Sequence, residues 1–339
     1  MPVAISQRMK SDGTLLLRHN EVAEQLTFKD CIIAVERIFR LQGEGKVPAP
    51  ETLGIDASHG GLHVKAGLLL GNKSYIVAKA NTNFPGNWSK FGLPTIQGII
   101  IIFDAESGYP LAVLDSTDIT IKRTAAASAV AAKYLARTNS SVGTICGCGQ
   151  QGRAHVRALS AVLPLKEIYA FDLNECAAQN LAIERAGELE VAIEPVRDLR
   201  DAIQKSDICV TCTTSRQFLI RRGDASAGTF IAAVGADNEY KQEIDPALMA
   251  SCKVVVDSLK QCSVIGDLHH AISAGLMRPG NVYAELAEIV AGKKAGRTAE
   301  DEIIIFDSTG VAIEDAITAV AVYEKASMRN IGNYFNFGG

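Results

Sequence analysis

One glycine-rich stretch and a few charged side chains are the parts of this sequence whose types and spacing could do chemistry. Residues 147–152 read Gly-Cys-Gly-Gln-Gln-Gly, which matches the G-x-G-x-x-G pattern of dinucleotide-binding turns. Lys79 lies in an otherwise apolar run, Arg123 precedes an alanine-rich stretch, and Asp237 follows a Gly-Ala pair. Cations in apolar surroundings need an anion, and a carboxylate at the end of a strand can move a proton. These features predict chemistry on an anionic substrate beside a dinucleotide.

The context of the glycine stretch favours dinucleotide binding over a purely structural turn. An apolar run at 142–146 predicts a buried strand before it, and helical periodicity over 153–163 predicts a helix after it. The first glycine would allow a tight turn, the second would let the backbone approach a pyrophosphate, and the third would let helix and strand pack closely. A second strand at 168–171 ends in an acid placed to bind a ribose hydroxyl. The candidate cofactor residues of this part are Gly147, Gly149, Gln150, Gln151, Gly152 and Asp172.

The residues around Asp172 predict a preference for NAD over NADP. A carboxylate there would accept a hydrogen bond from the ribose 2′-hydroxyl of NAD but would repel the 2′-phosphate of NADP. Leu173, Asn174 and Glu175 follow, so no arginine is adjacent to hold a phosphate.

The elements that must position these residues predict an α/β protein with a doubly wound parallel sheet. From residue 142 onward, strands at 142–146, 168–171, 190–193, 207–211, 229–234, 253–257 and 303–306 alternate with helices. In such sheets ligands lie beyond the carboxyl ends of the strands. The polar turns there add candidate cofactor residues, namely Thr213, Val234, Gly235, Ala236, Lys241 and Ser308, and the candidate substrate residue Thr309.

The remaining chain predicts a second, discontinuous α+β domain. Strands at 62–70, 75–80, 97–103 and 111–114 suggest a mostly antiparallel sheet, and prolines mark a loop before it, in the stretch VPAPETLG. Long helices are predicted at 117–135 and 311–328, and the second would return to this domain. We therefore expect a discontinuous first domain of residues 1–117 and 311–339, and a dinucleotide-binding Rossmann domain of residues 118–310.

Each charged candidate also has a structural interpretation. Lys79, Arg123 and Lys65, the last of which lies in the strand-like run HVKAG, could each be part of an internal ion pair. Asp237 could cap a helix that begins near Tyr240. Spacing alone does not decide between these interpretations and substrate binding.

Composition narrows the class of protein further. The chain has 339 residues, a formal net charge of −4 and 47% hydrophobic residues, which indicates a soluble protein of more than one domain and argues against nucleic-acid binding. We expect no membrane contact and a cytoplasmic location, because the N-terminus lacks a signal-peptide core and no apolar run approaches the roughly 18 residues of a membrane span. Eight cysteines, mostly in apolar runs, indicate buried thiols, and no spacing predicts a metal site.

Five sequence blocks together resemble one known family. They are KANTNFPGN, the run SGYPLAVLDSTDIT with its following RTAAAS, GCGQQG, VGADNEYKQEID and FDSTG. In this order they resemble the ornithine cyclodeaminase and mu-crystallin family, which also includes alanine dehydrogenases and ketimine reductases. The resemblance implies a homodimer whose first domain supplies the dimer sheet and the substrate pocket, with a Rossmann domain inserted into it.

The resemblance also implies roles for individual residues. Lys79 and Arg123 match the binders of the substrate carboxylate, Asp237 matches the acid or base beside the reacting amine, and Lys79 joins it as a candidate catalytic residue. Residues at positions of cofactor or substrate contact are Thr95, Arg123, Lys241 and Ser308. Two departures stand out: the stretch VPAPETLG lacks an arginine that the family often has, and Lys65 lies where the family often has Met-Pro. Lys65 could replace the missing cation.

The sequence thus predicts an NAD(H)-dependent oxidoreductase that acts at the Cα–N bond of a small L-amino acid or its imine. One alternative is an ornithine-type cyclodeaminase, which releases ammonia with catalytic NAD. A second is a binding protein of mu-crystallin type that holds a dinucleotide and a small ligand. The presence of Asp237 argues against a pure binder, which needs no proton shuttle.

Overall fold

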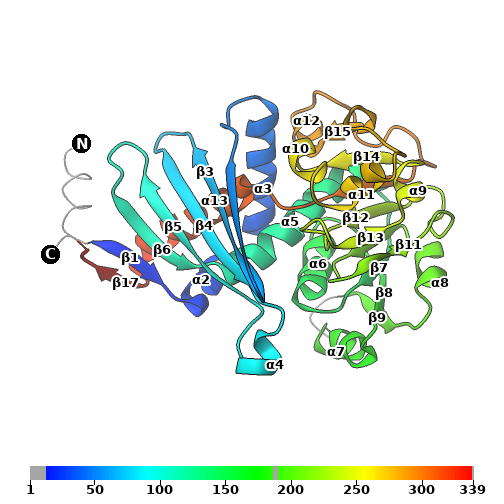
Figure 1. Cartoon of the computed structure of the whole chain (residues 1–339), viewed down its shortest axis with the longest axis horizontal. Helices are drawn as coiled ribbons and strands as arrows, with labels where there is room; N and C mark the ends of the chain where they lie inside the picture. Colours follow the sequence, from blue (N-terminus) through cyan, green and yellow to red (C-terminus); the bar gives the residue numbers. More distant parts are fainter. Residues whose placement is uncertain (1–12, 186–189, 338–339) are drawn as a thin grey trace. The chain divides into compact units, whose positions relative to one another are not determined.

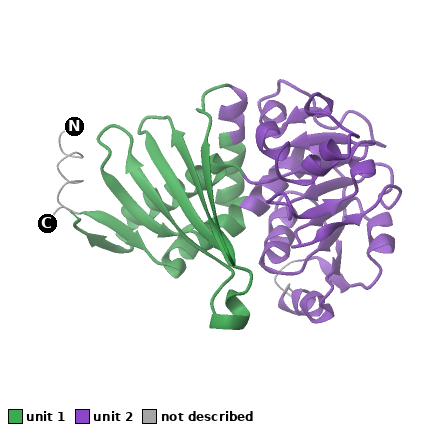
Figure 2. Cartoon of the chain, in the orientation of Figure 1, with its two compact units in different colours: residues 1–38, 45–123, 311–339 green, residues 39–44, 124–310 purple. Residues whose placement is uncertain are grey.

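The computed structural model describes residues 13–185 and 190–337, which divide into two compact units (Figure 2). The first unit comprises residues 1–38, 45–123 and 311–339, and the second comprises residues 39–44 and 124–310. The division falls between Arg123 and Thr124, inside the helix Thr117–Leu135, near whose start we expected the boundary, between residues 117 and 118. A short piece of the N-terminal half, residues 39–44, also belongs to the second unit.

A seven-stranded sheet forms the first unit, in the order β17-β1-β6-β5-β4-β3-β2 (Figure 1). Its strands are β1 (Thr14–Leu17), β2 (Glu51–Ala57), β3 (Gly60–Leu69), β4 (Tyr75–Asn83), β5 (Ile96–Asp104), β6 (Pro110–Asp115) and β17 (Asn333–Phe335). All neighbours are antiparallel except β1 and β6, which run parallel. The predicted antiparallel sheet is therefore present, although the interpretation of the stretch VPAPETLG as a loop is wrong at its end, where β2 begins.

Strand β2 was missed for a physical reason. All seven of its residues are exposed, so the alternation of Leu53, Ile55 and Ala57 with polar or small residues does not mark a buried face. It exists because it pairs along its whole length with β3.

Strand β4 positions a lysine in the interior. Side chains alternate across a strand, and the buried face of β4 carries Tyr75, Val77 and Lys79 in succession. Helix α13 (Ala312–Arg329) packs against β3 and β4. Two acids, Glu314 and Asp315, lie in the first turn of α13 and are buried.

Four more helices have residues in the first unit. They are α2 (His19–Gln25), α3 (Phe28–Gly43), α4 (Asn87–Phe91) and α5 (Thr117–Leu135). Helices α3 and α5 each continue into the second unit. Helix α5 carries the predicted alanine-rich run, whose residues 125–127 are buried.

The second unit is built on an eight-stranded parallel sheet in the order β15-β14-β16-β12-β10-β7-β8-β9. Its strands are β7 (Val142–Cys146), β8 (Glu167–Phe171), β9 (Ala192–Pro195), β10 (Ile208–Thr211), β12 (Phe230–Ala233), β14 (Lys253–Val256), β15 (Ala284–Glu285) and β16 (Ile304–Asp307). Strands β10, β12 and β16 are buried along their whole length, as expected for central strands covered on both faces. The predicted doubly wound sheet is confirmed, with one shift: β9 lies slightly later than the expected strand at 190–193.

Helices and one small ribbon complete this unit. The helices are α6 (Gln150–Ser160), α7 (Glu175–Arg185), α8 (Leu199–Gln204), α9 (Pro246–Met249), α10 (Leu259–Cys262), α11 (Asp267–Ser273), the 3₁₀ turn η1 (Pro279–Asn281) and α12 (Leu286–Val290). Strands β11 (Arg216–Ile220) and β13 (Gln242–Ile244) pair separately from the main sheet. Within residues 13–185 and 190–337, no helix combines the length and apolar content needed to cross a bilayer.

Candidate functional site

The glycine turn between β7 and α6 has the geometry of a dinucleotide-binding turn. Gly147 adopts a φ of +99°, which L side chains rarely adopt. A Cβ on Gly152 would lie 2.1 Å from the carbonyl oxygen of Gly147, so only glycine lets α6 start this close to the turn. A Cβ on Gly149 would instead meet no atom within 4 Å. Open space over Gly149, at the N-terminus of an 11-residue helix, fits the pyrophosphate of a dinucleotide.

Gln150 and Gln151 are the first two residues of α6, so their backbone N–H groups belong to the free first turn of that helix. The side-chain oxygen of Gln151 is buried and has no hydrogen-bond partner among the described residues.

Asp172 lies directly after β8 and braces the same turn. Its Oδ2 accepts a hydrogen bond from the backbone N–H of Cys148 at 2.8 Å, and its Oδ1 accepts one from Asn174 at 2.9 Å. Each carboxylate oxygen can accept a second bond, so this acid remains suited to a ribose hydroxyl.

The predicted residues after β10 and β12 form two loops that one buried acid joins. Thr213 donates to Oε1 of Glu243 from its backbone N–H at 2.6 Å and from its hydroxyl at 2.7 Å. The backbone N–H of Gly235 donates to Oε2 at 2.8 Å. Val234 and Ala236, on either side of Gly235, are both buried.

Asp237 ends the second of these loops and is accessible. Its side chain is 45% exposed, and Lys241 lies against it, with Nζ 2.8 Å from Oδ1. No helix begins near Tyr240: the described chain turns there and continues into β13. The interpretation of Asp237 as a helix cap is therefore wrong.

Ser308 and Thr309 follow β16 and are turned inward. Both hydroxyls donate to the carboxylate of Asp257 at 3.2 Å, and the backbone N–H of Gly310 donates to it at 2.6 Å. Because both side chains are almost fully buried, a ligand at this turn would meet backbone groups more readily than the hydroxyls.

In the first unit, Lys79 and Arg123 converge on the acids of α13. Nζ of Lys79 lies 2.8 Å from Oδ2 of Asp315 and 3.4 Å from the hydroxyl of Thr120. Arg123 donates from Nε to Asp315 at 2.8 Å and from Nη1 to Glu314 at 3.0 Å. The internal ion pairs that the sequence left open are thus present.

Burial and neighbouring charges set the protonation states in this cluster. Burial, reinforced by the nearby cations Arg123 and Lys65, lowers the pKa of Lys79 to about 7, although Asp315 opposes the shift. Burial alone would raise the pKa of Asp315, but Arg123 and Lys79 outweigh it and lower that pKa. Near neutral pH, Lys79 can therefore exist with or without its proton.

Lys65 belongs to the same cluster. It lies on β3 directly opposite Lys79 on β4, and its charge acts on both Lys79 and Asp315. The structure therefore brings the three predicted cations of the first unit together.

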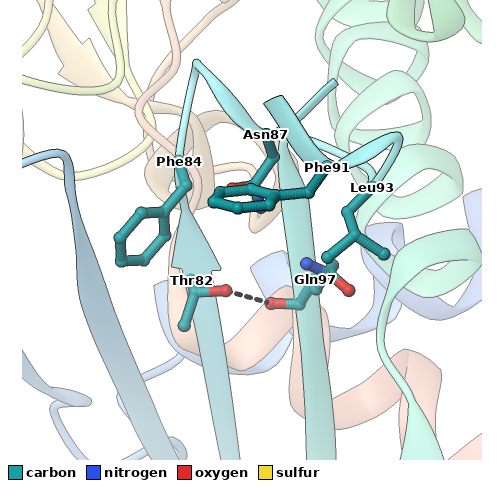
Figure 3. Close-up of a pocket in the computed structure, with 6 residues that line it drawn as sticks. All are labelled: Thr82, Phe84, Asn87, Phe91, Leu93 and Gln97. Carbon is teal, nitrogen blue, oxygen red and sulfur yellow. Dashed lines mark hydrogen bonds between the residues drawn. The ribbon is translucent and has the colours of Figure 1, made fainter. Parts of the chain in front are cut away.

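Thr95 lies apart from these cations in sequence and is exposed in the segment between α4 and β5. Its carbonyl oxygen accepts a hydrogen bond from the backbone N–H of Phe84 at 2.9 Å. An open pocket of about 430 Å³ lies beside this segment (Figure 3), lined by Thr82, Phe84, Asn87, Phe91, Leu93 and Gln97. Its lining is apolar with a few amide and hydroxyl groups and no charge, so it does not suit a carboxylate.

Several acids of these sites were not among the predicted residues: Glu243, Asp257, Glu314 and Asp315. The available signal was an acid inside or beside an apolar run, as at Asp257 directly after the run 254–256. No group of three or more His, Cys, Asp or Glu side chains in the described part of the chain is arranged to hold a metal ion.

Comparison with known proteins places the chain in a family. Residues 13–330 match the ornithine cyclodeaminase/mu-crystallin family. An alanine dehydrogenase from Archaeoglobus fulgidus is 38% identical over 96% of this chain and 98% of its own length. The fold is similar to that of an archaeal alanine dehydrogenase dimer with bound NAD (TM-score 0.91, 37% identity, 96% of this chain and 99% of that one). It is also similar to that of the Δ¹-pyrroline-2-carboxylate reductase of Thermococcus litoralis in complex with NADH and L-proline (TM-score 0.87, 35% identity, 95% of this chain and all of that one). This protein belongs to the ornithine cyclodeaminase/mu-crystallin family.

Proposed function

We propose that this protein is an NAD(H)-dependent oxidoreductase that acts at the Cα–N bond of a small L-amino acid or its imine. The observation that carries the proposal is the glycine turn, with its open space over Gly149 at the start of α6. The alanine dehydrogenase with bound NAD and the pyrroline-carboxylate reductase with NADH and L-proline support the same chemistry.

Two kinds of residue in this chain would hold the cofactor. The backbone of Gly149 and the first turn of α6 would bind the pyrophosphate, and Asp172 would accept a hydrogen bond from a ribose hydroxyl. A bound nicotinamide supplies the hydride acceptor or donor. The loops that carry Thr213 and Gly235 follow the central strands β10 and β12, where the other half of the dinucleotide lies in folds of this type.

Lys79 and Arg123 would bind the substrate carboxylate. Arg123 uses Nε and Nη1 for Asp315 and Glu314, and we assign Nη2 to the substrate. Both cations are held by acids of α13, so their side chains are already in place when the substrate arrives. Lys65 would add a third positive charge.

Asp237 would exchange the proton of the substrate nitrogen or of the attacking water. Its carboxylate is accessible, and its ion pair with Lys241 orients it. Lys79, with a pKa of about 7, is suited to take or give a second proton. In the oxidative direction an L-amino acid, NAD⁺ and water give the 2-oxo acid, ammonium, NADH and a proton. In the reductive direction a cyclic imine, NADH and a proton give the cyclic amino acid and NAD⁺.

We propose NAD(H) over NADP(H) as the cofactor. Asp172 follows β8 and would repel a 2′-phosphate bound there, and two arginines of this part of the second unit are paired with acids. Arg153 donates to the carbonyl oxygen of Cys148 and to Glu184, and Arg197 pairs with Glu175. These acids would compete with a phosphate for both arginines.

We further propose that the protein is a cytoplasmic homodimer. The first unit exposes apolar side chains on β2, α4 and β5, namely Leu53, Ile55, Trp88, Phe91 and Ile99, and Trp88 is 74% exposed. Such surfaces usually mark contact sites, and the NAD-bound archaeal relative is a dimer. Light scattering on Trp88→Lys should show a shift toward monomer, whereas a monomeric wild-type protein at micromolar concentration would contradict the proposal.

One assay tests the proposed activity against its alternatives. The protein is incubated with a panel of L-amino acids and NAD⁺, and with cyclic imines and NADH, while NADH absorbance and ammonia are both measured. A dehydrogenase or reductase changes NADH in proportion to product. A cyclodeaminase of ornithine type would release ammonia with no net NADH, and a binding protein would bind NADH without turnover.

A further inference from the structure

Besides Asp257, which binds the turn of Ser308 and Thr309, three acids of the second unit are completely buried and have no role in the proposed chemistry. They are Glu243, Asp267 and Asp307, each with no exposed surface. A buried carboxylate is unfavourable unless hydrogen bonds compensate it. The contacts of each acid therefore indicate what it does.

Asp307 and Asp267 form successive links between segments. Asp307, the last residue of β16, accepts hydrogen bonds from the backbone N–H groups of Asp267 at 3.3 Å and Leu268 at 2.9 Å. Asp267 in turn accepts at Oδ1 from the backbone N–H groups of Glu243 at 2.7 Å and Ile244 at 2.8 Å. Strand β16 thus holds the start of α11, and α11 holds β13.

Glu243 completes the series at the carboxyl edge of the sheet. Its Oε1 accepts both bonds from Thr213, and its Oε2 accepts the bond from Gly235. A Cβ on Gly235 would lie 2.5 Å from Oε1 of Glu243 and 2.4 Å from the carbonyl oxygen of Thr213. The carboxylate therefore fills the space between the loops after β10 and β12, and only a glycine allows it there.

An acid is an unfavourable choice for a merely space-filling role. Burial raises the pKa of Glu243, against the hydrogen bonds from Thr213 and Gly235, and burial raises the pKa of Asp307 to about 7. The carboxylate of Glu243 has one property that an amide lacks: both of its oxygens accept hydrogen bonds, so it can hold two loops at once.

We propose that Glu243 is a positioning residue for hydride transfer, which holds the loops of Thr213 and Asp237 at the spacing that presents them to the nicotinamide and the substrate. This inference rests on the proposed function. It predicts that loss of one acceptor oxygen of Glu243 slows hydride transfer. Binding of the ADP-ribose part of the cofactor, which is distant from these loops, should not change.

The test is Glu243→Gln in the full-length protein, studied with NADH and with ADP-ribose, which lacks the nicotinamide. The amide keeps one acceptor and turns a donor toward a backbone N–H, so one loop loses its partner. We expect the single-turnover rate constant for hydride transfer to fall on the order of tenfold to a hundredfold, while the dissociation constant of ADP-ribose changes less than about threefold.

Asp207→Asn is the matched control. Asp207 precedes β10 and accepts hydrogen bonds from the backbone N–H groups of Ser141 at 2.8 Å and Val142 at 3.1 Å, at the opposite, amino edge of the same sheet. The same chemical change there should lower the melting temperature without changing the hydride-transfer rate constant. An equal loss of rate in both variants would assign Glu243 a general structural role and overturn the inference.

A second pair of variants keeps the inference testable if Glu243→Gln does not fold. Thr213→Val removes the hydroxyl bond to Glu243, and Thr213→Ser keeps it. We expect Val to slow hydride transfer and Ser to restore it, and an unchanged rate in the Val variant would overturn the inference. A wild-type protein that neither binds NADH nor transfers hydride would instead refute the proposed function itself.

Discussion

Replacing Asp315 by Asn should expose the energetics of the buried charge cluster in the first unit. In the native protein two cations, Lys79 and Arg123, face two acids, Asp315 and Glu314, and the side chains of all four are at most 7% exposed. The variant removes the carboxylate that pairs with Lys79 and with Nε of Arg123, so Arg123 keeps its charge with Glu314 as its remaining acid of this pair, and Lys79 loses the anion that favours its proton. Breaking a buried ion pair by removing one member costs about 3–5 kcal/mol. We expect a loss of that size in the free energy of unfolding at pH 7.

The loss should also depend on pH, because Lys79 can release its proton. Its pKa is about 7 with Asp315 present, and since Asp315 raises it, the variant should have a lower value. Below pH 7 the native wild-type protein keeps this proton, as the unfolded chain does, so Lys79 adds no pH dependence there. The native variant lacks the proton while its unfolded chain holds it. Its free energy of unfolding therefore decreases by about 1.4 kcal/mol for each unit by which the pH is lowered. The deficit should therefore widen below pH 7 and stay constant above about pH 8.

Urea unfolding of both proteins, followed by circular dichroism between about pH 6 and pH 9, measures this deficit. Asp201→Asn is the control, since Asp201 pairs with Lys205 on the surface with more than half of each side chain exposed. It should cause a much smaller and pH-independent loss. A deficit for Asp315→Asn that equals the control, or that does not change with pH, would refute the reasoning about this cluster.

Three further predictions concern single residues. Asp237→Asn should lower kcat by about 10²–10⁴-fold with NADH affinity unchanged, because it removes a proton carrier, and a variant with normal turnover would exclude Asp237 from catalysis. Asp172→Ser should narrow the preference for NADH over NADPH in fluorescence titrations, and tighter binding of NADPH by the wild-type protein would contradict the proposed cofactor. Burial lowers the pKa of His155 from its usual 6.5 to about 4, so its contribution to stability is present above pH 6.5 and lost as the pH falls toward 4. Unfolding curves over that range should lose part of their pH dependence in His155→Gln, and identical dependence in both proteins would show that His155 does not titrate as inferred.

The parts of the fold that sequence could predict are those set by local pattern. Strand β7, the glycine turn and α6 follow directly from an apolar run, three spaced glycines and helical periodicity. The exposed strand β2 was not predicted in this way: it directly follows two prolines, none of its residues is buried, and it is held by pairing with β3. Pairing between strands depends on a neighbour, whereas periodicity depends on the strand alone.

The candidate site divides in the same way. The sequence by itself determined that Lys79 and Arg123 need anions and that Asp237 follows a buried strand, because residue type and local apolar context are enough for that. Only the tertiary structure decided which anions they meet: Arg123 bonds to Asp315, 192 residues away along the chain. Likewise, Glu243 is an ordinary acid in the sequence, and it becomes the link between two loops only where the parallel sheet brings the ends of β10 and β12 side by side. Contacts between distant segments depend on how the chain packs, and local sequence carries no record of that packing.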